Sequence, residues 1–226
     1  MREIIIKSRK EAGISDEALY ALDKESHRMW AEQGMEAPWM HLTFEEFQEK
    51  IHHAPMFVAL DAETGELLGM HSFRPHRKQH WCYGFRLAVA ESARHEGIAT
   101  RMLEYEAEFI RQKGYRYLTG STSTTAAWSV RWHLKNGYRI VGCYRMPNNN
   151  FTNYVFRKQL APSILWGPTF GPLTAKVCFA VSCLVNHLFK HSDGRDNLIG
   201  KFARRMIHRV TCNKVYRAAH FVSYLK

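Results

Sequence analysis

The chain has 226 residues, of which 46% are hydrophobic and 23% are charged, proportions that are ordinary for a soluble globular protein. No stretch reaches the roughly 18 apolar residues of a membrane-spanning helix, and no cleavage site follows the short apolar run near the N-terminus. We therefore predict neither a spanning helix nor a signal peptide. The five cysteines form no CxxC pair, which argues against a zinc site or a disulfide framework and favours a reduced, cytoplasmic compartment.

The net charge of +11 is concentrated near the C-terminus. Residues 162–226 hold ten Lys and Arg against two Asp, whereas residues 1–161 hold 22 Lys and Arg against 19 Asp and Glu. This asymmetry indicates an anionic partner for the C-terminal part, either a membrane surface or a polyanion. No specific nucleic-acid site is predicted.

The first half of the chain predicts two helices followed by three antiparallel strands. Residues 15–33 carry apolar side chains at helical spacing. A second helix begins at Thr43, because Glu46 three residues further on completes a capping box. The strands are expected over residues 56–61, 67–73 and 80–90.

The next part alternates helices and strands. One helix runs from about Gly97 to Gly114, and another covers about 125–135 and ends at Gly137. Strands are expected over 115–119, 138–144 and 154–158. This order predicts an α/β fold with a sheet flanked by helices. The hydroxyl run at 121–125 is expected to cap the following helix, with a contact to a ligand as the alternative.

Prolines and glycines from Pro162 to Pro172 mark a linker, which divides the chain into a domain over 1–161 and an extension over 162–226. The extension is predicted to be helical, with an apolar stretch at 173–189 and basic residues at 201–217. Two interpretations remain open. Residues 173–217 could bind an anionic membrane surface as a basic amphipathic helix, or they could form a helical hairpin that packs on the domain, which we favour.

The most informative segment is L-A-V-A-E-S-A-R-H-E-G-I-A-T, residues 87–100, in which a strand is followed by a turn and a helix N-terminus. The first N–H groups of a helix lack internal partners and the helix dipole favours negative charge there. Small residues at Gly97 and Ala99 would let a phosphate approach the backbone. The alternative is an ordinary strand-to-helix turn that uses glycine.

This turn resembles the acyl-CoA-binding motif of the GNAT acetyltransferase superfamily, in which Gln/Arg-x-x-Gly-x-Gly/Ala follows the fourth strand. The matching residues are Arg94, His95, Glu96, Gly97, Ile98, Ala99 and Thr100. The resemblance implies that their N–H groups hold the coenzyme A diphosphate. It also implies that Leu87, Ala88 and Val89 pair with the pantetheine arm, and that an N–H near Val89 stabilises the oxyanion.

A second family pattern, N-x-x-A-x-x-L-Y-x-K-x-G-F, aligns with residues 126–138. Lys135, Gly137 and Tyr138 fit it, whereas Ala126 replaces the Asn of the pattern. The resemblance extends over residues 1 to about 160. It implies a GNAT-like mixed, mostly antiparallel central sheet with acetyl-CoA as co-substrate, and it places Ala126 beside the cofactor.

The departures concern the catalytic residues. His133 occupies the position where the family often has a tyrosine that protonates the departing thiolate, and an imidazole could serve as that acid or simply pack beside the cofactor. Tyr83 stands where some relatives have a glutamate base. His76 and His80 are further candidates, and positioning alone is the alternative to any base. For Trp30, Trp39 and Trp81, a place in the core is favoured over a role at the acceptor.

Together these features predict an N-acetyltransferase in which an amine attacks acetyl-CoA directly within a ternary complex. The acceptor could be a small molecule or a protein amine. Two alternatives stay open: transfer of a longer acyl group near a membrane, and a non-catalytic module that binds coenzyme A. No metal site is predicted, and the protein is expected to be cytoplasmic, with peripheral membrane association as an open possibility.

Overall fold

The computed structural model describes residues 2–76, 81–146 and 148–161, together with Lys176, Phe179, Ala180, Cys183 and Leu184. Two compact units make up the chain, Met1–Leu118 and Thr119–Lys226. The predicted boundary at residue 161 adjoins residues outside the described part and stays a prediction, as does the linker from Pro162 to Pro172.

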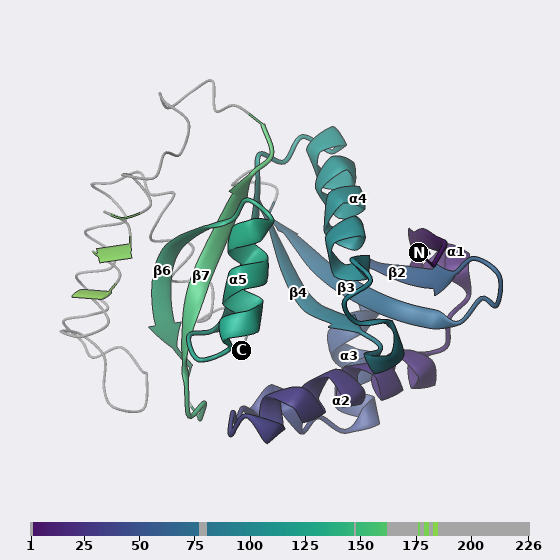
Figure 1. The fold of residues 1–226 in the computed structure, drawn as a ribbon, viewed down its shortest axis with the longest axis horizontal. Coiled ribbons are helices and arrows are strands. Elements are labelled where there is room, and N and C mark those ends of the chain that lie inside the picture. The colour runs from purple at the N-terminus through teal and green to yellow at the C-terminus, as the bar shows by residue number, and fades with distance from the viewer. Residues whose placement is uncertain are drawn as a thin grey trace. The chain divides into compact units, whose positions relative to one another are not determined.

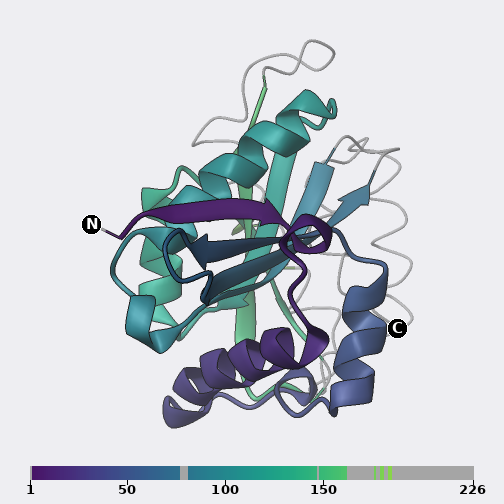
Figure 2. The same ribbon diagram turned by 90° about the vertical axis from the view of Figure 1, so that its right-hand side faces the viewer.

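The first unit is built on four antiparallel strands in the order β1-β2-β3-β4 (Figure 1). The strands are β1 Ile4–Ser8, β2 Met56–Asp61, β3 Leu67–His76 and β4 Trp81–Val89. The helices are α1 Arg9–Ala12, α2 Asp16–Glu32, α3 Phe44–His52 and α4 Ile98–Gln112, with 3-10 turns η1 Pro38–Met40 and η3 Glu91–Ala93. Helix α4 covers one face of the strands, and α2 and α3 cover the other (Figures 1 and 2).

The second unit contains β5 Tyr117–Ser123, which begins at the end of the first unit, α5 Ala127–Lys135, β6 Arg139–Arg145 and β7 Thr152–Gln159. Its strands follow the order β5-β7-β6. Strands β6 and β7 form an antiparallel hairpin, with Arg139 opposite Arg157 and Arg145 opposite Thr152.

Apolar side chains from the strands and from the helices form the core of the first unit. Leu19 of α2, Phe47 of α3, Val58 of β2, Leu68 of β3 and Met102 of α4 are completely buried. Burying a side chain of this size contributes about 1.5–3 kcal/mol, so these contacts hold the helices against the strands.

A polar pair lies inside the α4 side of this unit. His71 Nδ1 of β3 faces a carboxylate oxygen of Glu106 of α4, and both side chains are buried. A Cβ atom at Gly84 of β4 would come within 2.7 Å of His71 Nε2, so a glycine is needed for the ring to fit. The neighbouring Cys82 is buried as well, and burial, followed by the nearby Glu106 charge, raises the pKa of its thiol far above the ordinary value.

Most predicted elements are confirmed. The capping box of Thr43 and Glu46 is present, Ser15 caps α2, and Gly114 and Gly137 follow the ends of their helices with positive φ. Strand β1 was not expected, because an isolated apolar run of this length carries no periodicity. It forms by pairing with β2, Ile4 opposite Asp61 through Ser8 opposite Phe57.

The prediction that the hydroxyl run caps α5 is wrong. Ser121 and Thr122 belong to β5, which extends to Ser123, and the N-cap residue is Ala126, which makes no side-chain cap. Ser123 Oγ instead accepts a hydrogen bond from Thr125 N at 3.2 Å. The hydroxyl therefore stabilises the turn before the helix.

Part of the C-terminal extension is described. Phe179 packs edge-on against Tyr154 of β7, with ring centroids 5.7 Å apart. Four residues further on, Cys183 Sγ lies 3.3 Å from Cys143 Sγ of β6. Among the described residues, no helix is long and apolar enough to cross a membrane.

Candidate acyl-CoA site

The turn between β4 and α4 presents its backbone to solvent. After η3, the chain passes through two residues with positive φ, His95 at 68° and Gly97 at 80°, before α4 begins at Ile98. A Cβ atom built at Gly97 would meet nothing within 4 Å. A ligand can therefore approach the backbone closely at this point.

The N-terminus of α4 has no side-chain cap, because its N-cap residue is Gly97. The N–H groups of the first turn are consequently not taken up by a cap, and a helix of 15 residues adds its dipole at this end. Ile98 is buried and fixes the start of the helix, whereas Ala99 and Thr100 are half-buried. Arg94 supplies a half-buried cation, so the residues present fit a diphosphate group.

The prediction for the turn concerns its backbone N–H groups, and two of its side chains have surroundings of their own. Glu96 Oε2 lies 3.5 Å from Arg2 Nε, which directs its carboxylate to the chain N-terminus. His95 is exposed. Glu96, whose side chain is negatively charged, can contribute only its backbone to an anion site of this kind.

The strand segment that precedes the turn is interrupted by a bulge. Ser72 of β3 pairs with Phe85 and Met70 pairs with Ala88, so Arg86 and Leu87 of β4 lie opposite the single residue between them. Ala88 is buried, whereas Leu87 and Val89 are half-buried. A bulge bends a strand and redirects the groups that follow it.

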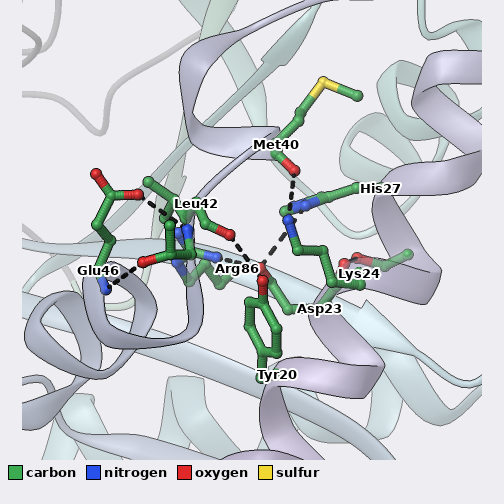
Figure 3. A network of polar contacts seen from close by, with 10 residues as sticks. Tyr20, Asp23, Lys24, His27, Met40, Leu42, Glu46 and Arg86 are labelled. Atoms are coloured by element: carbon green, nitrogen blue, oxygen red, sulfur yellow. Dashed lines mark hydrogen bonds and ion pairs between the residues drawn. The ribbon is translucent and has the colours of Figure 1, made fainter.

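A polar network lies on the α2 side of this bulge (Figure 3). Arg86 Nη1 is 2.5 Å from Asp23 Oδ2, and His27 Nδ1 is 3.7 Å from the same oxygen. Burial disfavours the charged imidazole and lowers the pKa of His27 to about 4, although the charge of Asp23 opposes this. Lys24 Nζ donates to Met40 O at 3.2 Å. Sequence reasoning missed this network, although Asp23 lies four residues from the buried Leu19 on the apolar side of α2.

The candidate bases of β3 and β4 are surrounded by aromatic rings. Tyr83 is buried and lies parallel to Phe85, with centroids 6.2 Å apart. His76 stacks on Trp81 at 4.0 Å, and burial, followed by the charge of Arg74, lowers the pKa of its imidazole. His80 lies outside the described residues. Tyr83 and His76 stay candidates, because neither contact excludes a role in proton transfer.

The tryptophans near α2 also pack with other rings. Trp39 lies 4.9 Å from the His27 ring and 5.8 Å from Trp30, both edge-on. Trp30 and Trp39 are half-buried and Trp81 is buried, so of the three tryptophans only Trp81 has the expected place in the core.

His133 and Ala126 belong to the second unit. His133 Nδ1 lies 2.8 Å from Ser129 O, and its ring stacks on Phe156 with centroids 4.4 Å apart. A carbonyl oxygen only accepts, so Nδ1 carries the hydrogen and Nε2 of the neutral ring is an acceptor. Ala126 is buried at the start of α5. The structure thus brings the turn and residues 87–89 together in one unit, and Ala126 and His133 together on one helix of the other.

Within the described residues, no group of three or more His, Cys, Asp or Glu side chains could hold a metal ion.

The strands flanked by helices and the open, uncapped turn after β4 are the features expected of a transferase that uses an acyl-coenzyme A. Residues 17–138, more than half of the chain, match the Acetyltransferase (GNAT) family. The chain belongs to this family, whose members use acetyl-CoA as co-substrate. The predicted GNAT-like fold is confirmed.

Solved structures share this fold at low sequence identity. The ribosomal-protein-S18-alanine N-acetyltransferase from Escherichia coli superposes with a TM-score of 0.57 at 12% identity, over 74% of this chain and all of its own. An N-acetyltransferase from Staphylococcus aureus Mu50 gives 0.53 at 22% identity, over 70% of this chain and 99% of its own. No curated protein matches the sequence.

Proposed function

We propose that this protein is an N-acetyltransferase that transfers the acetyl group of acetyl-CoA to an amine by direct attack in a ternary complex. The observation that carries the proposal is the uncapped N-terminus of α4 behind an open Gly97. Such a site suits a diphosphate, and family membership makes coenzyme A the expected source of that diphosphate.

Binding would involve two adjacent segments of the first unit. The N–H groups of residues 94–100 would hold the diphosphate, and the backbone of Leu87, Ala88 and Val89 would pair with the pantetheine arm. The half-buried state of Leu87 and Val89 leaves part of this segment accessible. A backbone N–H near Val89 would stabilise the oxyanion that forms when the amine attacks the thioester carbonyl.

The reaction forms a C–N bond and breaks a C–S bond. The amine loses a proton and the departing coenzyme A thiolate gains one. His133 is the proposed donor, and it must act as the imidazolium, because the hydrogen on Nδ1 is held by Ser129 O. Its Nε2 then carries the proton that is transferred.

A base for the amine is proposed at Tyr83 of β4, with His76 and His80 as alternatives. Tyrosine has an ordinary pKa near 10 and is a weak base at neutral pH. Binding an amine that is already deprotonated, in the correct orientation, would serve the same end without a base.

The proposed acceptor is an amine of either a protein or a small molecule. The structurally similar Escherichia coli enzyme is named for an alanine of a ribosomal protein, so both protein amines and small-molecule amines belong in the test set. Transfer of a longer acyl group and binding without catalysis are the competing functions.

The test combines binding and turnover on the full chain. Calorimetry with acetyl-CoA measures binding, and thiol release measures transfer to a panel of peptide N-termini, polyamines and amino sugars. We expect saturable binding and amine-dependent thiol release. Binding without release on any amine would favour the non-catalytic module, preference for long-chain acyl-CoA would favour the other alternative, and no binding at all would overturn the proposal.

A further inference from the structure

The backbone of β4 is held in an uncommon conformation at Arg86. This residue has φ of 55°, and with His95 and Asn148 it is among the non-glycine residues with positive φ in the described part of the chain. L-residues pay a conformational penalty in this region, so they keep it only where surrounding contacts enforce it. Arg86 is also one of the two bulged residues opposite β3.

The side chain of Arg86 is fixed by two helices. Its Nη1 contacts Asp23 Oδ2 of α2 at 2.5 Å (Figure 3). Its guanidinium lies 5.2 Å from the ring centre of Phe47 of α3. The side chains of Arg86 and Asp23 are 9% and 2% exposed, and Phe47 is completely buried. An ion pair with so little water around it is weakly screened and geometrically restrictive.

The groups around Asp23 leave the arginine as its main partner. Asp23 Oδ1 has no hydrogen-bond partner among the described residues. His27 is 3.7 Å away, and with a pKa of about 4 it is neutral at physiological pH. Lys24 is directed to Met40 O. Removal of Arg86 would therefore leave a buried carboxylate without its cation.

The bulge lies between two parts of the candidate site on the same strand. Tyr83 comes three residues before Arg86, and the segment Leu87–Ala88–Val89 follows it directly. A change at Arg86 would alter the direction of the N–H and C=O groups at 87–89, because a bulge determines how the strand continues.

We propose that the buried Arg86–Asp23 pair is a positioning device, which locks the bulge of β4 and so presents residues 87–89 in the geometry that acetyl-CoA requires. The proposal rests on the proposed function for its ligand. Arg86 and Asp23 act through the backbone of β4, and neither side chain needs to contact acetyl-CoA.

A matched pair of variants separates the backbone effect from the loss of the side chain. Asp23→Asn/Arg86→Gly and Asp23→Asn/Arg86→Ala both remove the ion pair and leave no buried charge. Glycine adopts positive φ freely and alanine does not. We expect calorimetry to show acetyl-CoA affinity about tenfold weaker for the alanine variant than for the glycine variant. Arg86→Lys retains a cation for Asp23 but loses the guanidinium over Phe47, so its affinity should lie between those of the wild type and the alanine variant.

The milder variant Asp23→Asn gives a second measurement if the double variants fail to fold. Hydrogen exchange of the amides at 86–89 should be faster in this variant than in the wild type, while exchange in the core of α4 stays unchanged. Equal affinity of the glycine and alanine variants, or unchanged exchange at 86–89, would overturn the positioning role. If the wild type does not bind acetyl-CoA, the proposed function fails, and the exchange experiment still decides whether the pair locks the bulge.

Discussion

His133 is the residue whose surroundings bear most directly on the chemistry. Its Nδ1 donates to Ser129 O and its ring stacks on Phe156, so its orientation is fixed by α5 and β7. A fixed ring with Nε2 as the exchangeable position suits proton donation, and it equally suits a packing role. Kinetics of variants can separate the two.

Tyrosine and phenylalanine at position 133 differ by one hydroxyl group. If His133 protonates the thiolate, His133→Phe should lower turnover by roughly 100-fold, since it retains the stacking but has no proton to donate. His133→Tyr should keep much of the activity, and the decline of its rate at high pH should move toward the ordinary pKa of tyrosine, about 10. Steady-state kinetics with binding of acetyl-CoA as control checks this. Equal losses of binding and turnover in both variants would assign His133 to packing.

His27 links protonation to stability. Its pKa is lowered to about 4 in the folded protein from 6.5, so the unfolded chain binds the proton more readily between these values. Above about pH 6.5 His27 is neutral in both states and does not change the free energy of unfolding. As the pH falls from there to about 4, the unfolded chain takes up the proton first, and the free energy of unfolding decreases by about 3 kcal/mol.

Replacing His27 by Phe removes this titration and preserves a ring against Trp39. We expect urea denaturation of the variant to show a smaller loss of unfolding free energy between pH 7 and pH 4 than the wild type, by about 3 kcal/mol. Carboxylates titrate in both proteins and cancel in the comparison. Identical pH dependence of the two proteins would show that His27 takes up its proton with the same pKa in the folded and the unfolded protein.

At the scale of elements, the N-terminus of α4 is the feature on which the proposed acetyl-CoA site depends. Its positive φ makes Gly97 a strained position for any other residue, whatever space surrounds it. A substitution there therefore changes backbone conformation as well as charge, and the two effects need separate controls.

Gly97→Glu and Gly97→Gln impose the same strain and nearly the same bulk, and they differ in one negative charge. We expect Gly97→Glu to bind acetyl-CoA at least about tenfold more weakly than Gly97→Gln at low salt, because its carboxylate repels the diphosphate. The difference should narrow as salt screens the charges. Calorimetry at two ionic strengths measures it. Equal affinities of the two folded variants for acetyl-CoA would show that the diphosphate does not bind at this turn.

At the scale of the whole molecule, the basic extension after residue 161 has two alternative roles. The described residues Phe179 and Cys183, four positions apart, contact Tyr154 of β7 and Cys143 of β6. Residues with this spacing share one face of a helix. These two contacts favour the packed hairpin over the membrane-bound helix. For the remaining residues of the extension, both alternatives stay predictions.

Truncation and vesicle sedimentation compare the two alternatives. A chain ending at residue 161 should unfold at lower temperature than the full chain or aggregate, because Tyr154 and Cys143 lose apolar contacts. The full chain should not sediment with anionic vesicles. Sedimentation at low salt that disappears at high salt, together with a stable truncated protein, would instead establish the extension as a membrane anchor.

The sequence by itself determined the features that depend on local chemistry. The capping box at Thr43, the glycines that end helices and the turn from Arg94 to Thr100 all follow from conformational preferences of a few neighbouring residues. Only the tertiary structure decided features that join distant segments. Strand β1 depends on β2, and the Arg86–Asp23 pair joins residues 63 positions apart. The sequence does not show which residue pairs with an arginine in an apolar strand. The attraction between Arg86 and Asp23 becomes strong only in the low dielectric that arises when α2 and α3 pack over β4.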